Sequence, residues 1–409
     1  MSHDGKYPVE PGFDHFVYYR NKSRKDLYPD TAGLLGHHGD SWYQVRSKVQ
    51  QVMLRPKSAM FYLKHLEDIS VDLCNLIKES LDENEEIADV LEYVNRWSLE
   101  SIVAIFLDNR LHCLKKHLPQ DSEPTRFVNA VKIATGTDTT DLAFGVPLWK
   151  LYPTPVFRRF DAAMQTIHDI SKRMVDNAIA DLKKRGPDTT GELSVLQKLI
   201  NKCGPDSQIP IVMSQDAIMA GVDTTGTTAA FILLDLATNP DKQELLFQEI
   251  NRVIGDGDVT ESKLNQMKYL KACLHESQRL NPAILGMSRR TQSDMVLEGY
   301  QIPKNSIVSY FFQNAMRDPD QWTDPDQFQP ERWLRGCPQH HSAHPYAHII
   351  FSHGPRMCIG KRFAELEVYI MTIKIVQRYR LEYHHDEVGV ATEFVNKPDK
   401  PIKMKFVQR

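Results

Sequence analysis

Apolar residues recur at every third or fourth position over most of the chain, which is the period of an α-helix with one buried face. Capping residues and prolines that interrupt this recurrence mark where one helix ends and the next begins. The pattern predicts helices at residues 40–48, 56–82, 86–107, 121–140, 155–186, 210–238, 240–254, 260–280 and 363–378. The stretch 210–238 is apolar along nearly its whole length, so a charged residue inside it needs an explanation.

Residues 282–312 follow a different pattern, in which apolar and polar positions alternate as they do in β-strands. Turns at Glu298-Gly299 and Pro303-Lys304-Asn305 separate these strands, and a few more short strands are expected before Arg409. Residues 1–40 and 315–350 are rich in turn-forming residues and show neither period, so irregular structure is expected there. The chain is therefore predicted to be mainly α with small β-sheets.

Composition narrows the class of protein without identifying it. A hydrophobic content of 41% and a charged content of 25% are typical of a soluble globular protein. The net charge of −3 gives no electrostatic reason to expect a nucleic-acid partner. No apolar run is expected to be long enough to cross a bilayer, and the first residues, MSHDGKYPVE, do not have the pattern of a signal or transit peptide.

The six cysteines are scattered without a C-x-x-C pair, which fits a reducing compartment better than a disulfide framework. A group of one cysteine and four histidines raises the question of a zinc site, but its spacing fits no closed tetrahedral pattern. These residues are Cys337, His340, His341, His344 and His348.

The most informative cysteine is Cys358, which lies in a turn directly before a predicted helix. A cysteine at a helix N-terminus beside a cation, here Arg356, is expected to be a thiolate. A thiolate is the axial ligand that a haem iron needs for cleavage of the O–O bond. Phe351 can shield the sulfur, and Gly354 and Gly360 let the backbone approach a porphyrin. Taken alone, a cysteine before a helix is more often a buried structural residue.

A second group of polar residues, Asp223 and Thr224, interrupts the apolar stretch 210–238. The carboxylate is costly there unless it is paired or used, and the threonine hydroxyl can bond to a backbone carbonyl and loosen the helix. Ala220 and Gly221 leave room for a ligand beside these residues. Together the acid and the hydroxyl could pass protons to O₂. A threonine-rich kink with a solvated aspartate is the alternative.

Three further features are weaker on their own. Trp42 and Arg46 share one helix face, where an indole N–H and a guanidinium suit a carboxylate, although a surface arginine beside a half-buried tryptophan is equally ordinary. Glu276 and Arg279 form an i,i+3 pair of a common kind. The aromatic and proline-rich segment 144–153 is either a lid that dips into a membrane surface or a loop packed on the core.

Five motifs of this chain resemble those of the cytochrome P-450 family, and they occur in the family's order. They are W-x-x-x-R at 42–46, A-G-x-D-T-T at 220–225, E-x-x-R at 276–279, P-E-R-W at 330–333 and F-x-x-G-x-R-x-C-x-G at 351–360. The resemblance implies the cytochrome P-450 fold, with 1–409 as a single haem-thiolate monooxygenase domain that begins after the family's targeting sequence, first helix and part of its first sheet. One departure is Ser352, where the family usually has glycine.

The resemblance also implies roles for particular residues. Haem b, the iron protoporphyrin IX, would have Cys358 as its metal ligand, and Asp223 and Thr224 would be catalytic. The residues expected to bind the cofactor are Cys358, Trp42, Arg46, Arg289, Arg356, Phe351, Gly360, Ala220 and Gly221. Arg290 remains an alternative to Arg289, because adjacent strand residues face opposite ways. Glu276, Arg279 and Arg332 would form a structural network behind the haem.

Within the family, the chain is most similar to the arthropod members of the animal mitochondrial clan, through KYPVEPGF, LLGHHGDSWYQVRSKVQQVMLRP, AGVDTT and GPRMCIGKRFAELE. This implies a monooxygenase that inserts one atom of O₂ into an apolar, sterol-like or cuticle-related lipid on the matrix side of the mitochondrial inner membrane, with peripheral membrane contact and no nucleic acid. Electrons would come from an acidic, adrenodoxin-like ferredoxin that docks on a basic patch.

The residues expected to form that patch are Lys268, Lys271, Lys361 and Arg362, and His275 stands where the clan commonly has a lysine. Two other functions remain open. One is a haem-thiolate isomerase or dehydratase that uses no O₂, against which Asp223 and Thr224 argue. The other is a truncated, non-catalytic product that binds haem or a lipid.

Overall fold

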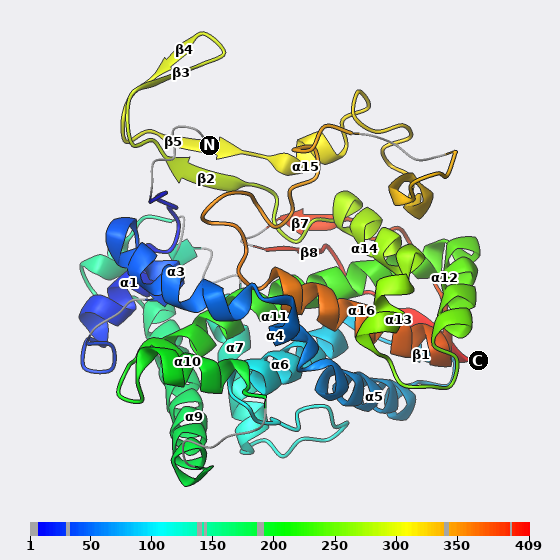
Figure 1. The fold of residues 1–409 in the computed structure, drawn as a ribbon, viewed down its shortest axis with the longest axis horizontal. Coiled ribbons are helices and arrows are strands. Elements are labelled where there is room, and N and C mark those ends of the chain that lie inside the picture. The colour runs from blue at the N-terminus through cyan, green and yellow to red at the C-terminus, as the bar shows by residue number, and fades with distance from the viewer. Residues whose placement is uncertain are drawn as a thin grey trace.

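The computed structural model describes residues 7–29, 33–136, 141–142, 145–185, 192–338, 343–392 and 395–409. Helices make up most of this part of the chain, and the strands form small sheets at separate places in the molecule, as Figure 1 shows. The predicted class, mainly α with small β-sheets, is confirmed.

The helical elements in the N-terminal half are α1 (Asp14–Tyr18), the π-helical η1 (Tyr19–Ser23), α2 (Gly33–Gly36), α3 (Gly39–Met53), α4 (Pro56–Met60), α5 (Leu63–Ser80), α6 (Val90–Phe106), α7 (Glu123–Thr135), the short η2 (Leu148–Lys150), α9 (Pro155–Arg185) and α10 (Val195–Cys203). Those that follow are α11 (Ile209–Thr238), α12 (Pro240–Val253), α13 (Glu261–Gln266), α14 (Lys268–Leu280), α15 (Phe312–Met316), the short η3 (Pro330–Trp333) and α16 (Lys361–Arg378).

The strands are β1 (Glu86–Ile87), β2 (Met287–Arg290), β3 (Met295–Leu297), β4 (Tyr300–Ile302), β5 (Ile307–Tyr310), β6 (Tyr379–Glu382), β7 (Val390–Thr392), β8 (Asn396–Pro398) and β9 (Met404–Gln408). They pair as a three-stranded sheet in the order β1-β9-β6 and as the two-stranded sheets β2-β5, β3-β4 and β7-β8. Every pairing is antiparallel.

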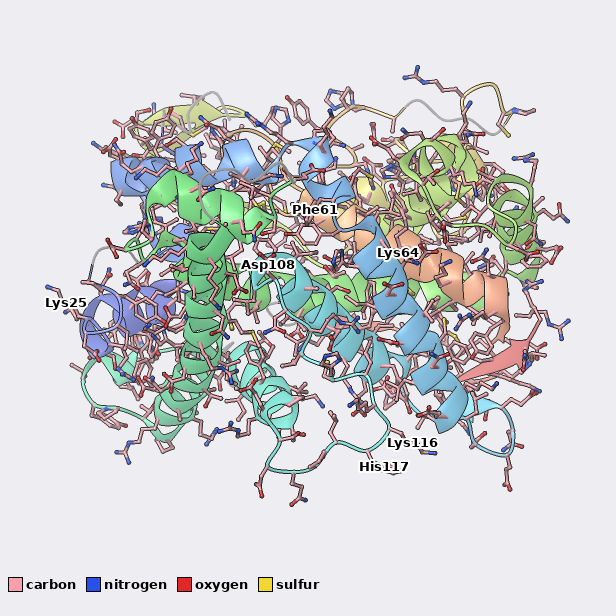
Figure 2. All side chains as sticks on the ribbon, turned by 60° about the horizontal axis from the view of Figure 1, so that its bottom comes forward. Lys25, Phe61, Lys64, Asp108, Lys116 and His117 are labelled. Carbon is pink, nitrogen blue, oxygen red and sulfur yellow. The ribbon has the colours of Figure 1, made fainter. Side chains whose placement is uncertain are left out.

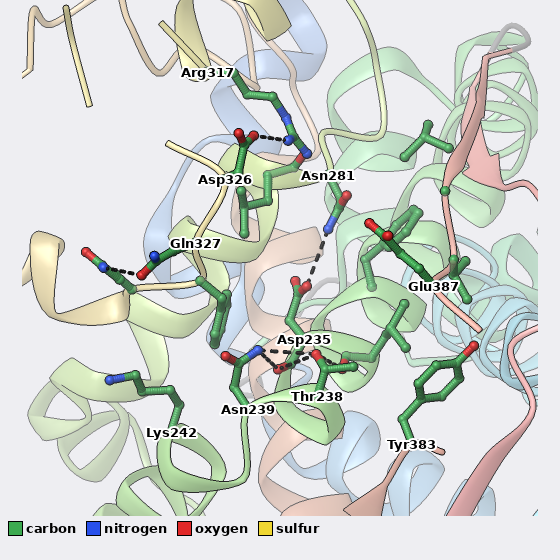
Figure 3. A pocket seen from close by; sticks show the side chains of 18 of the residues that line it. Asp235, Thr238, Asn239, Lys242, Asn281, Arg317, Asp326, Gln327, Tyr383 and Glu387 are labelled. Atoms are coloured by element: carbon green, nitrogen blue, oxygen red, sulfur yellow. Dashed lines mark hydrogen bonds and ion pairs between the residues drawn. The ribbon is translucent and has the colours of Figure 1, made fainter. Parts of the chain in front are cut away.

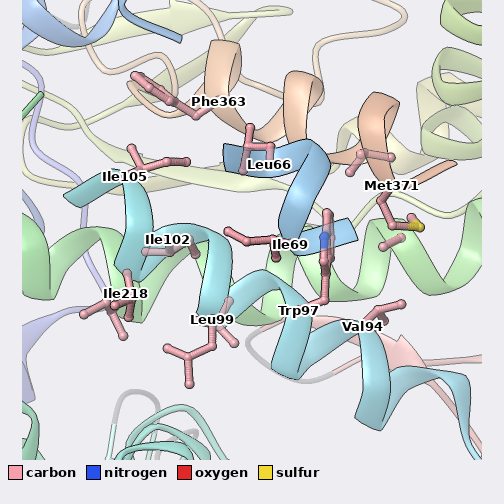
Figure 4. Close-up of a cluster of buried hydrophobic side chains, with 14 of the residues drawn as sticks. Leu66, Ile69, Val94, Trp97, Leu99, Ile102, Ile105, Ile218, Phe363 and Met371 are labelled. Atoms are coloured by element: carbon pink, nitrogen blue, oxygen red, sulfur yellow. The ribbon is translucent and has the colours of Figure 1, made fainter. Parts of the chain in front are cut away.

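The hydrophobic core is built around α11, which packs against α6, while α5 and α16 complete the layer (Figure 4). Ile102 of α6 and Ile218 of α11 belong to this core, as do Ile69 of α5 and Met371 of α16. By length and composition α11 could cross a membrane, so the expectation that no such run exists is wrong. Most of the helix is nevertheless buried inside the protein, as a core helix must be.

The polar counterpart of this core is the outer surface, which Figure 2 shows with all side chains drawn. Lys64 on α5 and the loop residues Lys116 and His117 are exposed there. The division between apolar interior and charged exterior follows the three-to-four-residue period of the sequence, which is why the helices were predictable.

Several boundaries differ from those predicted. The stretch 56–82 divides into α4 and α5, and 260–280 divides into α13 and α14 at the non-helical Met267. Residues 7–36, expected to be irregular, contain α1, η1 and α2, and α10 was not predicted at all. Its signal was present, because Ser194 and Gln197 form a complete capping box.

Glu276 joins α14 to the segment that leads towards Cys358. Its carboxylate accepts two bonds from Arg279, at 2.9 and 3.0 Å, and one from Arg332 at 2.8 Å. Trp333 Nε1 donates to it at 2.8 Å, and the backbone N–H of Gln329 does so at 3.0 Å. The carboxylate and both guanidiniums are buried, so the charges compensate one another away from water.

A second buried carboxyl group, that of Glu367 on α16, has no such compensation. Its side chain is 2% exposed, and its Oε2 has no hydrogen-bond partner among the described residues. Burial raises the pKa of this group to about 8. The folded protein therefore keeps Glu367 neutral at pH values where the unfolded chain would ionise it.

We expect Glu367→Gln to stabilise the protein, by roughly 4 kcal/mol at pH 8 and by almost nothing at pH 4.5. Between these values the unfolded chain releases a proton that the folded protein retains, so this group lowers the free energy of unfolding as pH rises. Thermal unfolding at pH 5, 6.5 and 8 measures the difference, with Glu387→Gln at an exposed position as the control. A difference that does not grow with pH would show that Glu367 is not a neutral acid in the fold.

Candidate active site

Cys358 and the Asp223-Thr224 pair line a single cavity of about 590 Å³, although they come from different elements. Cys358 lies in the loop before α16, and the acid and alcohol lie in the middle of α11. The segment from Pro282 to Met287, expected to line the substrate pocket, forms another wall. The remaining wall is largely apolar, with Phe13, Phe16, Leu35, Met219, Phe311, Val368 and Val395.

The loop that carries Cys358 is held by its own backbone. The N–H of Cys358 donates to the carbonyl of Phe351 at 2.9 Å, and the N–H of Met357 donates to that of Gly354 at 3.0 Å. Gly354 has a φ of +82°, which a glycine adopts without strain. Phe351 also lines the cavity, and the Lys361 ammonium lies 5.2 Å from its ring centre.

Cys358 differs from the other cysteines in what it faces. It is exposed to the cavity, whereas Cys74, Cys113 and Cys273 are buried. Surrounding protein nevertheless removes the sulfur from bulk water, and this burial raises the pKa of the Cys358 thiol, although backbone N–H groups of Gly360 and Lys361 at the start of α16 lower it. The expectation that the surroundings alone hold a thiolate is therefore wrong. A bound metal cation would be needed to remove the proton.

The cavity face of α11 carries Ala220, Asp223 and Thr224 at i, i+3 and i+4. The Thr224 hydroxyl donates to the carbonyl of Ala220 at 2.8 Å, as the sequence had suggested it could. Gly221 does not leave room for a ligand, and this expectation needs correction. A Cβ placed on Gly221 would lie 2.6 Å from Ile102, so the glycine allows close packing of α11 on α6.

Three buried arginines lie close together, and one of them, Arg356, lines the cavity, whereas Arg46 and Arg289 are not among its lining residues. Arg356 lies over the ring of Trp42, with 4.1 Å between guanidinium carbon and ring centre, and Arg46 lies 5.9 Å from the same centre. Arg289 pairs with Glu10 at 3.0 Å. Burial, opposed by the charge of Glu10 and reinforced by Arg289 and Arg46, lowers the pKa of Arg356 to about 10.

This cluster has more positive than negative charge. Its three guanidiniums are buried, and among the described residues the carboxylate whose charge acts on Arg356 is that of Glu10. Arg46 donates to the carbonyl of Met357 at 2.9 Å, but its Nε is buried without a partner in the described part of the chain. Three guanidiniums with one carboxylate leave an excess of two positive charges, and the Arg46 Nε donor has no partner within the residues that the structure describes. This arrangement fits a ligand with two carboxylates, as the propionates of haem b provide.

The structure distinguishes the two adjacent arginines of β2. Arg289 is buried beside Glu10, whereas Arg290 is only half-buried and donates to the carbonyl of Asn305 at 3.0 Å. Glu10 itself was not singled out from the sequence. The only signal was a carboxylate inside the proline-rich run KYPVEPGF.

The expected basic patch is partly neutralised. Lys268 and Arg362 are exposed, whereas Lys271 is half-buried and Lys361 pairs with Glu365 at 3.8 Å. His275 adds no charge, because burial lowers its pKa to about 4. It packs against Trp333 and His348 in the interior, with ring centres 5.3 and 5.6 Å away.

A larger and more polar pocket, of about 1020 Å³, lies where α11 and α14 end (Figure 3). Asp235 lines it, and burial raises the pKa of this carboxyl group to about 7. Asn239 donates to the carbonyl of Asp235 at 2.8 Å, and Thr238 donates to that of Leu234 at 2.9 Å. These two side chains satisfy carbonyls in the last turn of α11.

The remaining sequence expectations have mixed outcomes. In the segment 144–153, Trp149 is buried and stacked on Phe157, as expected for a loop packed on the core, while Val146, Leu148, Leu151 and Tyr152 are exposed. The interpretation as a lid that dips into a membrane surface stays a prediction. Phe144 lies outside the described residues, as do His340 and His341 of the suggested zinc group. The described residues contain no group of three or more histidine, cysteine, aspartate or glutamate side chains placed to bind a metal ion.

Comparison with known proteins agrees with this geometry. The family model described as "Cytochrome P450" matches residues 10–406. The chain belongs to the cytochrome P-450 family. It is 33% identical to the probable mitochondrial cytochrome P-450 12a5 of Drosophila melanogaster, over 98% of this chain and 78% of that protein. It is 34% identical to the probable mitochondrial cytochrome P-450 301a1 of the same species, over 99% and 74%. The mitochondrial sterol 26-hydroxylase of Mus musculus is 29% identical, over 100% and 78%.

Membership makes this cytochrome P-450 a monooxygenase with haem b as its cofactor. Ser352 occupies a position where the family usually has glycine. Ser352 has a φ of +59°, in the left-handed region that side chains with a Cβ rarely adopt. Its hydroxyl lies 3.4 Å from that of Tyr310, which is too long to offset much strain.

We expect Ser352→Gly to raise the free energy of unfolding of this cytochrome P-450 by about 1 kcal/mol, because glycine adopts a positive φ without strain. Denaturant or thermal unfolding of the haem-loaded protein measures the change. His353→Gly is the matched control, since His353 does not have a positive φ and glycine there adds only chain entropy. Equal effects of the two variants would contradict the strain at Ser352.

Proposed function

We propose that this protein inserts one atom of O₂ into an apolar lipid, sterol-like or cuticle-related, with electrons supplied by a ferredoxin. The observation that carries the proposal is the shared cavity, which brings the Cys358 sulfur and the Asp223-Thr224 pair to one largely apolar space. The Cys358 sulfur could act as a thiolate ligand, and the Asp223-Thr224 pair could deliver protons. The largely apolar lining of the cavity suits a substrate without charge.

The residues would divide the work of holding the cofactor. Cys358 would ligate the iron, and haem b, when bound, would supply the binding and activation of O₂. Trp42, Arg46, Arg289 and Arg356 would bind the propionates, which supply the missing negative charge of their cluster. The remaining residues would shape the cavity, with Phe351 shielding the sulfur and Ala220 and Gly360 keeping side chains out of the way.

Asp223 and Thr224 would deliver protons. General acid catalysis requires a proton donor within hydrogen-bond reach of the reacting group, and both residues line the cavity on the side that α11 forms. Their presence argues against a haem-thiolate isomerase or dehydratase, which needs no proton relay. A truncated product that only binds haem or a lipid would show no turnover of any substrate.

The location and substrate class are proposed from the relatives. The names of the Drosophila melanogaster and Mus musculus proteins include "mitochondrial", and the Mus musculus protein is named a sterol hydroxylase. We place this protein on the matrix side of the inner membrane. The exposed apolar side chains of Val146, Leu148, Leu151 and Tyr152 suit shallow contact with that membrane.

Cys358→Ser should abolish the thiolate-type Soret band of the reduced, carbon monoxide-bound protein while leaving most of the fold intact. The reason is that a serine hydroxyl does not replace the thiolate as an iron ligand. Difference spectroscopy measures the band, and circular dichroism measures the helix content. Cys203→Ser, at another partly exposed cysteine, is the control. A Cys358→Ser protein with the same band would mean that another residue binds the iron.

The double charge reversal Lys271→Glu with Arg362→Glu should slow electron transfer from a ferredoxin at least about tenfold at low salt and flatten its salt dependence, because basic residues steer an acidic partner. Stopped-flow reduction measures the rate. Substrate binding and the haem spectrum should not change. The matched control reverses Lys25 and Lys116, which are exposed elsewhere on the surface (Figure 2). Equal rates in both variants would remove the basic patch from the proposal.

A further inference from the structure

Asp223 has a partner that lies far from it in the sequence. Lys397 Nζ is 3.2 Å from Asp223 Oδ2. Asp223 is 8% exposed, whereas the Lys397 side chain is 23% exposed and so extends from the cavity wall towards solvent. No motif points to Lys397, which lies on β8 near the C-terminus.

The strand that carries Lys397 is firmly placed. β8 pairs with β7 and packs against α11. Asn396, which is 2% exposed, donates its backbone N–H to the carbonyl of Ala283 at 2.9 Å and its side-chain amide to that of Pro282 at 2.7 Å. Successive side chains of a strand point to opposite faces, so this anchor directs Lys397 to the other face, towards α11.

The pairing of Asp223 with Lys397 explains how a charged residue can stand inside the apolar stretch 210–238. A carboxylate at the edge of an apolar cavity is costly unless an opposite charge or several donors compensate it. The Lys397 ammonium supplies that charge at Oδ2 of a side chain that also lines the cavity. Thr224, the next residue, has its own hydroxyl turned to the Ala220 carbonyl, so the alcohol and the acid are each held by a separate bond.

We propose that Lys397 is the positioning residue of the proton relay, holding Asp223 in place and connecting this buried acid to solvent. Water at the partly exposed Lys397 end of the pair would first protonate the Asp223 carboxylate, and the group would return to a carboxylate paired with the ammonium once that proton had passed towards Thr224 and the cavity. The inference rests on the proposed relay role of Asp223 and Thr224, and it adds a third residue from a different element.

The first test measures coupling in the haem-loaded protein, as product formed per electron pair. Lys397→Met should lower this ratio at least about tenfold, with O₂, two electrons and two protons giving hydrogen peroxide instead. The substrate dissociation constant should stay within about twofold, because Lys397 is not among the residues that line the cavity. Lys397→Arg should restore most of the ratio, since it keeps the charge. Lys400→Met, in the same segment, should behave as wild type.

The second test does not depend on turnover. In a double-mutant cycle of thermal unfolding, Asp223→Asn and Lys397→Met should lower the melting temperature together by less than the sum of their separate effects, because either change alone breaks the pair. Additive effects would overturn the pairing.

The outcomes separate the inference from the function on which it rests. If Thr224→Ala uncouples the enzyme and Lys397→Met does not, the relay stands and the role of Lys397 is refuted. If neither variant uncouples it, the relay is refuted and the role of Lys397 with it. If Lys397→Met uncouples the enzyme and Lys397→Arg fails to rescue it, charge positioning is refuted.

Discussion

Burying the Glu276 carboxylate is the constraint on which the rest of the site depends. Because no water can reach it, every oxygen lone pair has to be used by a donor from the protein. The donors come from α14 itself and from residues 329–333, so the carboxylate ties the long irregular segment before Cys358 to a helix. The loop that carries Cys358 has backbone hydrogen bonds of its own. The buried charge adds a fixed connection between α14 and the segment that precedes this loop.

The arginine cluster beside the cavity differs from the Glu276 site, because its positive charges outnumber its negative ones. Burying guanidiniums without compensation costs free energy, and the lowered pKa of Arg356 reflects that cost. A protein tolerates such an arrangement when a bound anionic ligand offsets the cost, so binding of that ligand stabilises the folded state. Glu10 compensates part of the charge by pairing with Arg289. The propionates of the cofactor would complete the balance, which couples haem binding to the stability of the N-terminal segment.

How much could be read from the sequence depends on how far apart the interacting residues lie. Trp42 with Arg46, and Asp223 with Thr224, act within one helix, so their spacing carried the information. The break at Met267 could not be predicted, because α14 is capped by the Glu249 carboxylate of another helix, which accepts from the N–H groups of Tyr269 and Leu270 at 2.9 Å. The pairing of Glu10 with Arg289 and that of Lys397 with Asp223 likewise join distant segments. Long-range pairs leave no periodic trace in a sequence.

The most demanding element is α11, which has to be part of the core and a wall of the cavity at once. One face of the helix packs so closely on α6 that a Cβ on Gly221 would require the end of the Ile102 side chain to move, and another face presents the acid and the alcohol to the cavity. A carboxylate that close to an apolar core would weaken the helix packing if it drew water inward. Compensation from outside the helix avoids this, because the ammonium of Lys397 arrives on a strand that is anchored elsewhere, through Asn396. The charge of Asp223 on α11 is therefore compensated by a residue of β8, so the rest of the helix can pack in the hydrophobic core.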